Sequence, residues 1–600
     1  MTQDVAKMGH DRGASVSLRQ AMPAVPFARR VLAAITLERV SWLILFTCVV
    51  GIAIVPLFYV FDAATLRETR VGLSNERSFV ALLDVYTSSG YLAYLRNTLV
   101  LAAGVTFLSV VVGVSLAVLI ARTDVGYKST LDLLIIMPLF MSPFTGLMAW
   151  IALGSEKSGF INVLIKTILS PLLNSVPPVI NIWSYAGIVW VMVLFFCPFA
   201  YLFTVSSLRG MDSSLEESAR STGATPLQTL WHVTLPMSVP AIMGAALLIF
   251  ILGAEMYTIP GMIGSNVGFT TLPWKIYQDI NGVPVKLAHA AASGTLLLWI
   301  TCLGLLLQRR MTRRTEKFAT MTGKGFHSRP LPLGRWKFPA LAFIGAYIFA
   351  ADLLPFGGLL LSSMMKYSAP SITTDIFTIK NFTEFFMLQN MIGALRNTII
   401  LAILSASICA MAGFLISYME LRRVGVSTKL LAFIGVLPVA VPGVVYGIGL
   451  LWTFLRTPFY GSIWVLLFAY IAKFLPYSIV VSRSAIIQIH PDLEHSARMC
   501  GANGFRALRH ITMPLLKPAL IAILFFVMLM SIKELSASVL LYTQRSQVLS
   551  VLTWHYMDAG NYQFAAAIGV VQTLIMISLI FITRRIFRIQ LEKTISKSGT

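Results

Sequence analysis

Long apolar runs separated by short polar segments dominate the chain. An apolar run of about 20 residues is long enough to cross the hydrocarbon core of a bilayer as a helix. Because twelve runs meet or approach this length, the sequence predicts twelve transmembrane helices: Ser41–Phe61, Asn97–Ala121, Leu133–Ser155, Tyr185–Val205, Met237–Ala254, Ala290–Leu307, Phe338–Ser363, Asn397–Met419, Leu430–Leu455, Gly461–Ser482, Pro518–Ile532 and Gln563–Thr583.

Charge is distributed unevenly between the polar segments. The chain is 57% hydrophobic and 12% charged, with a net charge of +22. The loop 308–337 carries nine Lys and Arg residues against Glu316 alone, whereas loops of the other parity are balanced. This asymmetry predicts that both termini and loop 308–337 are cytoplasmic. It also accounts for the positive charge without nucleic acid as a partner, and the lipid bilayer is the expected surroundings.

The second half of the chain repeats the first. Leu95-Arg96-Asn97-Thr98 returns 300 residues later as Leu395-Arg396-Asn397-Thr398, and Pro198 and Gly223 return 278 residues later as Pro476 and Gly501. The smaller offset places an insertion of 22 residues in the first half, expected near 159–181. Six spans per half give both repeats the same orientation in the membrane. The predicted organisation is an N-terminal segment 1–40, a first repeat 41–307, a linker 308–337, a second repeat 338–583 and a tail 584–600.

Two polar loops, 212–236 and 490–514, carry nearly the same sequence: EESARSTGATPLQTLWHVTLP and EHSARMCGANGFRALRHITMP. Ser213 and Pro491 suit helix starts, and the spacing of the Glu and Arg residues predicts an i,i+4 ion pair on each helix, Glu216 with Arg220 and Glu494 with Arg498. A glycine at the end of each helix then predicts a left-handed turn.

A second short helix is expected after each glycine, capped by Thr225-Pro226 in one copy and Asn503-Gly504 in the other. One face of this helix would contain Leu227, Leu230 and Trp231 in the first copy and Phe505, Leu508 and Arg509 in the second. Pro236 and Pro514 then begin the next span. The pattern predicts a helix-turn-helix beside the membrane with an unpartnered apolar ridge.

The sequence E-x-[SA]-A-R-x-x-G, followed about a dozen residues later by a hydrophobic residue and x-x-P, resembles the signature loop of permease subunits of binding-protein-dependent ABC importers. The resemblance covers roughly Ser41 to Arg588. Lys533-Glu534-Leu535-Ser536-Ala537 and Phe474-Leu475-Pro476 resemble most closely the ferric-iron branch, whose permeases are often fused duplicates. Ser218, Ser496 and His495 depart from the common family pattern, but Glu, Arg and Gly are kept in both copies.

This resemblance implies an all-α polytopic protein of the type I importer class, with two parallel six-helix repeats, in a bacterial inner membrane. It further implies two copies of an ABC ATPase subunit and a periplasmic solute-binding protein as partners; this chain binds no cofactor, because ATP and Mg²⁺ belong to the ATPase. The residues expected to dock the ATPase are Glu216, Ala219, Arg220, Gly223, Leu227, Leu230, Trp231 and Pro236 in the first loop, and Glu494, Ala497, Arg498, Gly501, Phe505, Leu508 and Pro514 in the second.

Ionisable side chains within spans are expensive in a membrane and are therefore candidates for the transport path or its gate. The sequence offers five: Glu255, Asp352, Lys473, Lys533 and Glu534. Counting about 1.5 Å per helical residue from the ends of their spans places Asp352 and Lys473 about 9 Å apart in depth, which argues against a direct ion pair between them.

The chain contains no G-x-x-x-x-G-K-[ST] sequence and no metalloprotease or hydrolase motif, so we expect no ATPase or other catalytic site in it. The five cysteines contain no CxxC pair, and His490, Glu494 and His495 are interpreted as a helix start and not as metal ligands.

The main alternative to an importer permease is a twelve-helix secondary transporter, and a membrane-embedded enzyme is a weaker alternative. The expected solute is ferric iron, from the resemblance alone; thiamine, polyamines, phosphonates and sulfate remain alternatives.

Overall fold

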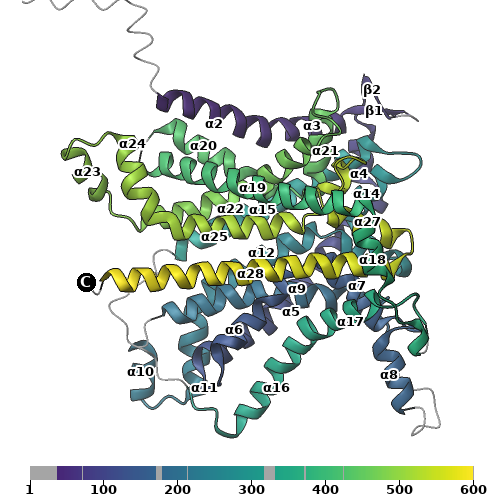
Figure 1. The fold of residues 1–600 in the computed structure, drawn as a ribbon, viewed down its shortest axis with the longest axis horizontal. Coiled ribbons are helices and arrows are strands. Elements are labelled where there is room, and N and C mark those ends of the chain that lie inside the picture. Colours follow the sequence, from purple (N-terminus) through teal and green to yellow (C-terminus); the bar gives the residue numbers. More distant parts are fainter. Residues whose placement is uncertain are drawn as a thin grey trace, which may run out of the picture. The chain divides into compact units, whose positions relative to one another are not determined.

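The computed structural model describes residues 37–69, 72–169, 179–211, 214–315, 331–369, 373–422 and 425–598 (Figure 1). Most of the predicted segment 1–40, residues 316–330 of the predicted linker, Ser213 and the last two residues of the tail lie outside the described residues.

Ten helices of the described residues are long and apolar enough to cross a membrane, and two bent helix pairs supply two further spans. The twelve-span prediction is confirmed in this form. In the first repeat the straight spans are α2 (Leu37–Ala53) with α3 (Val55–Ala64), α5 (Ser89–Arg122), α9 (Tyr185–Gly210), α11 (Pro226–Thr229) with η2 (Leu230–Thr234) and α12 (Leu235–Glu255), and α15 (Leu287–Thr315).

The straight spans of the second repeat follow the same order. They are η5 (Gly334–Trp336), α16 (Lys337–Ile348), η6 (Phe349–Leu353) and α17 (Leu354–Ser363) as one span, then α19 (Gln389–Arg422), α22 (Ile463–Ile487), α24 (Gly504–Ala507) with η9 (Leu508–Thr512) and α25 (Met513–Ile532), and α28 (Tyr562–Ser598).

The third span of each repeat is broken, where the sequence predicted a straight helix. In the first repeat α6 (Lys128–Ile136) and η1 (Met137–Phe140) meet α7 (Pro143–Gly154) at 96°; in the second, α20 (Val426–Val436) and η8 (Leu437–Ala440) meet α21 (Gly443–Phe454) at 112°. Proline explains the break, because it disfavours helical backbone in the residue before it. Ser142, which precedes Pro143, is accordingly extended, with φ −67° and ψ 134°.

Shorter elements connect the spans. An antiparallel hairpin, which the all-α prediction did not include, is formed by β1 (Leu66–Thr69) and β2 (Gly72–Arg77). The predicted insertion contains α8 (Phe160–Leu169). The remaining short helices are α4 (Val80–Thr87), α10 (Ser214–Ser221), α13 (Thr258–Gly264), η3 (Ser265–Val267), α14 (Leu272–Asn281), η7 (Thr374–Ile376), α18 (Lys380–Met387), α23 (Asp492–Met499), α26 (Ser538–Leu541) and α27 (Leu549–Asp558).

The two repeats exchange contacts through their first spans. Helix α3 packs against α21 of the second repeat, and α17 packs in the equivalent way against α7 of the first. At the first of these contacts the backbones touch, because a Cβ built on Gly449 would lie 2.3 Å from the carbonyl oxygen of Pro56. The broken third spans therefore lie at the interface between the repeats.

The repeated Leu-Arg-Asn-Thr sequence has a structural role. The hydroxyl of Thr98 accepts from Leu272 N at 2.8 Å, and the hydroxyl of Thr398 accepts from Leu549 N at 3.0 Å. These N–H groups begin α14 and α27 and have no partner within their own helices. The amide of Asn97 also donates to Thr270 O at 3.0 Å. The second span of each repeat thus positions the short helix that precedes the sixth.

Candidate functional site

The two polar loops fold alike and lie at the same end of the bundle, at the left of Figure 1. Helices α10 and α23 end as predicted in left-handed glycines, with φ +93° at Gly223 and +87° at Gly501. In the first loop Gly223 N donates to Arg220 O at 3.0 Å, and in the second Gly501 N donates to Arg498 O at 3.0 Å. These bonds satisfy carbonyl groups that a helix end leaves free.

The predicted caps of the following helix are also present. Thr225 and Gln228 form a reciprocal capping box, and the Asn503 side chain accepts from Arg506 N at 2.8 Å. The prediction of a helix-turn-helix is wrong in one respect, because the second short helix of each loop is not separate from the span that follows it. It continues through a π-helical turn into α12 in the first repeat and into α25 in the second. Pro236 and Pro514, in the first turns of α12 and α25, lack the N–H that a regular helix would use there, which favours such a turn.

The glutamates that the two loops share, Glu216 and Glu494, are buried, each only 3% exposed. Glu216 forms an ion pair with Arg122 at 3.1 Å and accepts from the Thr234 hydroxyl at 2.8 Å. The first loop is therefore fixed both to the end of the second span and to the π-helical turn that follows the loop.

Glu494 is held in the same way. It lies 3.5 Å from Arg422 and accepts from Thr512 at 2.6 Å and Tyr418 at 2.9 Å. The sequence predicted Arg498 as its ion-pair partner, but Arg498 is exposed and the observed ion pair is with Arg422. A buried carboxylate needs a charged partner, and a distant helix supplies one that is itself shielded from water.

Of the three apolar residues predicted on the outward side of the first loop, two are exposed, and Leu230 and Trp231 line a groove with residues of α5 and α12. Leu227 is 64% exposed and Trp231 is 63% exposed, whereas Leu230 is half-buried. In the second loop Leu508 is half-buried, and the side chain of Phe505 lies outside the described residues. Ala219 and Ala497 are half-buried at the loop surface.

Four of the five predicted in-span charges come together where the fifth and eleventh spans end. Lys473 pairs with Glu534 at 2.7 Å, and the Lys533 ammonium donates across the interface to Leu139 O at 2.7 Å. Glu255 interacts electrostatically with Lys473 and Glu534. Lys533 occupies the place in the second repeat that Glu255 has in the first. The cluster therefore joins the two repeats with opposite charges at equivalent positions.

Asp352 is not part of this cluster. It is buried in η6, and its Oδ2 atom has no hydrogen-bond partner among the described residues. The sequence argument against an ion pair with Lys473 agrees with the structure, since Lys473 pairs with Glu534.

Five aromatic side chains lie beside the charged cluster, around the short helices α14 and α27. The indole Nε1 of Trp554 donates to the Tyr277 hydroxyl at 3.1 Å, and the two rings are 5.4 Å apart at their centroids. Burial raises the pKa of Tyr277 to about 12. The other three are Phe144, Tyr257 and Trp274.

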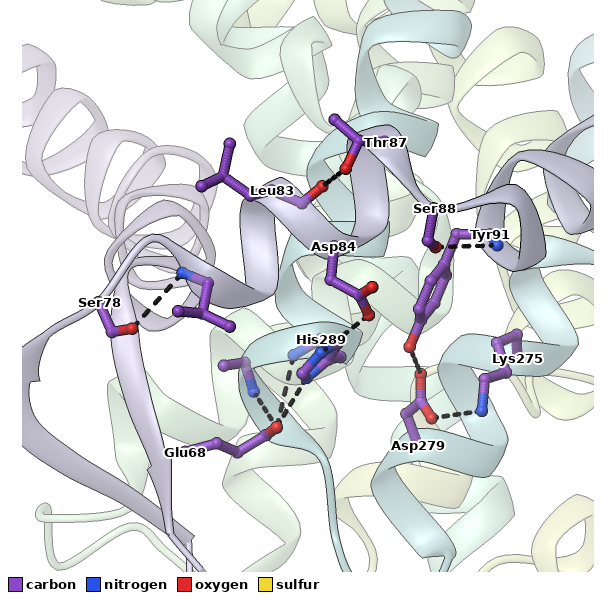
Figure 2. A network of polar contacts seen from close by, with 12 residues as sticks. Glu68, Ser78, Leu83, Asp84, Thr87, Ser88, Tyr91, Lys275, Asp279 and His289 are labelled. Atoms are coloured by element: carbon purple, nitrogen blue, oxygen red, sulfur yellow. Dashed lines mark hydrogen bonds and ion pairs between the residues drawn. The ribbon is translucent and has the colours of Figure 1, made fainter.

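Within the first repeat, a polar network ties α14 to α5 and the hairpin to α15 (Figure 2). Asp279 of α14 accepts from the Tyr91 hydroxyl at 3.1 Å and pairs with Lys275 at 2.7 Å. Glu68 of the hairpin contacts His289 at 2.6 Å and also accepts from the backbone N–H of Ala288 at the start of α15. Burial opposes ionisation of Glu68, but its bonds to His289 outweigh burial and hold the pKa of Glu68 below its ordinary value.

Sequence reasoning missed the arginines that anchor the loops and the aromatic residues at the interface. Arg122 and Arg422 are 300 residues apart, the same offset that relates the two Leu-Arg-Asn-Thr sequences, so the repeat contained a signal for this pair. Tyr277 and Trp554 are the sixth residues of two ten-residue helices, but they differ in type and carried no comparable signal.

Both loops lie within the part of the chain that matches a known protein family. The family described as "Binding-protein-dependent transport system inner membrane component" matches residues 109–317 and 402–595, which include both loops and together exceed half of the chain. The chain belongs to this family. It is thus a multi-pass inner-membrane permease with two copies of the family's domain.

The permease is similar along most of its length to ferric transport permeases. It is 25% identical to the ferric transport system permease protein FbpB of Actinobacillus pleuropneumoniae over 82% of this chain and 71% of that one. It is also 25% identical to the Fe(3+)-transport system permease protein FbpB 2 of Haemophilus influenzae over 90% and 96%.

Other similar proteins match one part of the permease. A putative 2-aminoethylphosphonate transport system permease protein, PhnV of Salmonella typhimurium, is 30% identical over 34% of this chain and 80% of that one. A solved structure of a bacterial ABC transporter involved in import of the polysaccharide alginate is 18% identical, with a TM-score of 0.35 over 43% of this chain and 96% of that one.

Proposed function

We propose that this permease carries solute through the interface between its repeats, driven by two ATPase subunits that dock on loops 212–236 and 490–514. The observation that supports this most is the construction of the loops. Each has a surface left open toward the end of the bundle and a buried ion pair that ties it to a span. A mere connector would need neither feature.

The helix that leaves each docking loop connects it to the charged cluster. Residues Pro226 to Glu255 form one continuous helix, which is about 45 Å long at about 1.5 Å per residue. Its first turns expose Leu227 and Trp231, and its last residue is Glu255. The equivalent helix of the second repeat ends next to Lys533 and Glu534. A push on the docking loops would therefore be transmitted along stiff helices to the cluster.

We assign the charged cluster and the five aromatic residues beside it to the transport path and its gate. In this arrangement the contact between Tyr277 and Trp554 closes the path at the end opposite the docking loops. Separation of the repeats by the ATPase cycle would break this contact and expose the ion pair of Lys473 and Glu534 to solute. Asp352 is proposed to act in the packing of the seventh span and not in the path.

The solute we propose is ferric iron, delivered by a periplasmic binding protein. The relatives that cover most of the chain are named as ferric transport permeases, whereas the phosphonate-named relative covers about a third of it. The positive-inside asymmetry supports cytoplasmic termini and cytoplasmic docking loops. Thiamine, polyamines, phosphonates and sulfate are the alternatives within the same transport class.

Reconstitution tests the proposal. Vesicles holding the permease, its ATPase and its binding protein should accumulate labelled ferric iron only with ATP. Accumulation of a different solute under the same conditions would overturn iron as the cargo. Accumulation driven by a proton or sodium gradient with the permease alone would overturn the ABC mechanism and favour a secondary transporter.

A further inference from the structure

A groove of about 330 Å³ lies between α19 and α22, and none of its lining residues belongs to the charged cluster, to the aromatic residues around α14 and α27, or to the docking loops. Most of its lining is apolar, and an arginine, an asparagine and a tryptophan are among the lining residues. The lining residues are Arg396, Asn397, Ile400, Leu401, Leu404, Ile463, Trp464 and Leu467.

The depth of Arg396 follows from the length of α19. The other end of this helix, Arg422, pairs with Glu494 of the docking loop and so lies at that membrane surface. Arg396 is 26 residues away along the helix, which corresponds to about 39 Å. Because the hydrocarbon core is about 30 Å thick, Arg396 reaches the headgroup layer of the opposite surface. Trp464, in the first turn of α22, is 49% exposed at the same groove, where tryptophan favours the membrane interface.

The groove thus combines a cation at headgroup depth with apolar walls that run toward the bilayer centre. The Arg396 side chain is exposed and takes part in no hydrogen bond or ion pair within the described part of the chain. We propose that the groove is a binding site for an anionic phospholipid, with its phosphate at Arg396 and one acyl chain along Ile400 and Leu404. An anion without an acyl chain would leave the apolar walls unused.

The first repeat contains the same arginine but not the same groove. Arg96 is equivalent to Arg396, but Gly104 replaces Leu404 and Tyr185 replaces Ile463. The Tyr185 hydroxyl lies 3.9 Å from where a Cβ on Gly104 would be, and its ring packs 5.2 Å from Phe269. The tyrosine therefore covers this part of α5, which makes Arg96 a matched control.

Native mass spectrometry of the full permease, purified from vesicles of phosphatidylglycerol and phosphatidylethanolamine, tests the site. Arg396→Gln should lose phosphatidylglycerol adducts by about fivefold, as expected for one basic side chain near a charged lipid surface, and Arg96→Gln should keep them. Leu404→Trp, which fills the groove without changing charge, should also lose them.

Three outcomes would overturn the proposal. Equal adduct numbers in all variants would show that the groove does not hold the lipid. Equal losses in Arg396→Gln and Arg96→Gln would show a general surface-charge effect. Displacement of phosphatidylglycerol by inorganic phosphate would show that the site recognises the anion alone. Unchanged melting temperatures of the variants would separate these results from misfolding.

Discussion

Tyr277 and Trp554 occupy equivalent positions in the two repeats and contact each other, with a hydrogen bond of 3.1 Å from the indole to the hydroxyl. Their helices, α14 and α27, are each held by a threonine of the second span in the same repeat. A contact between equivalent residues lies on the axis that relates the repeats. Motion of one repeat relative to the other should therefore change the distance between these two side chains.

Linking these two positions should stop transport. In a variant without the five native cysteines, Tyr277→Cys with Trp554→Cys joined by a short reducible bis-methanethiosulfonate reagent should lower ATP-driven uptake about tenfold or more, because the repeats can no longer separate there. Reduction should restore uptake. Labelled-solute uptake into vesicles before and after reduction is the measurement.

The control for this link lies within the first repeat. The hydroxyls of Tyr86 and Thr295 are 3.1 Å apart, and a cross-link between cysteines at these positions joins no second repeat. Uptake should be retained after that cross-link. Retained uptake with positions 277 and 554 joined would show that the path does not open at this contact.

The buried ion pairs of the docking loops should matter more for stability than their exposed apolar residues. Glu216→Gln leaves the Arg122 charge, whose side chain is 7% exposed, without its partner in a buried place, which costs about 3–5 kcal/mol. We expect a lower melting temperature of the purified permease and weaker capture of the ATPase subunit.

Trp231→Ala provides the comparison, because Trp231 is 63% exposed. It should leave the melting temperature unchanged and weaken only ATPase capture. The double variant Arg122→Met with Glu216→Leu should recover part of the lost stability, since it removes both charges. An unchanged melting temperature for Glu216→Gln would refute the anchoring role of the pair.

The loops also show what a sequence can predict. The caps at Thr225 and Asn503 and the left-handed Gly223 and Gly501 depend on residues within a few positions of each other, and all were predictable. The partner of Glu494 is 72 residues away at Arg422, and a local spacing argument pointed instead to Arg498. Ion pairing within a helix is weak, so a better-shielded partner from another helix decides the contact.

The spans likewise have some features that the sequence predicts and others that it does not. Hydrophobic length predicted all twelve, but not the bends at Pro143 and Pro442, because both arms of each broken span are apolar. The clustering of Glu255 with Lys473 and Lys533 requires knowledge of how the repeats face each other, which hydropathy does not contain. The hairpin 66–77 is polar and short, and it escaped a prediction built on apolar runs.

Lys473 should be needed for transport but not for docking of the ATPase. Lys473→Met leaves Glu534, which is 6% exposed, as an unpaired buried carboxylate, and we expect uptake to fall about tenfold. ATPase capture by the purified permease should not change. Adding Glu534→Gln to the same chain should restore part of the uptake if the penalty comes from the unpaired charge.

Lys366→Met is the matched control for Lys473, since the Lys366 ammonium donates to a backbone oxygen at the surface, Asp375 O at 2.8 Å. Its uptake should equal that of the unmodified permease. Full uptake by Lys473→Met would remove Lys473 from the path.

Acid should loosen the hairpin by protonating Glu68. The pKa of Glu68 lies below its ordinary value of 4.5, because its bonds to His289 outweigh its burial. A depressed carboxyl pKa contributes stability that is complete above the ordinary value and is lost as pH falls through the lower, folded-state value. Hydrogen exchange of β1 and β2, corrected for its intrinsic pH dependence, should therefore accelerate as the pH falls below about 4.5.

Two variants separate this effect from general acid unfolding. Glu68→Gln should exchange faster near neutral pH and lose the acid-dependent step, because its side chain has no proton to gain. Glu76→Gln changes a second carboxylate of the same hairpin, whose partner Arg67 is exposed, and should keep the step. Since Glu68 also accepts from the first N–H groups of α15, the step should extend to the start of that helix. The same acid-dependent step in Glu68→Gln would assign it to a different group.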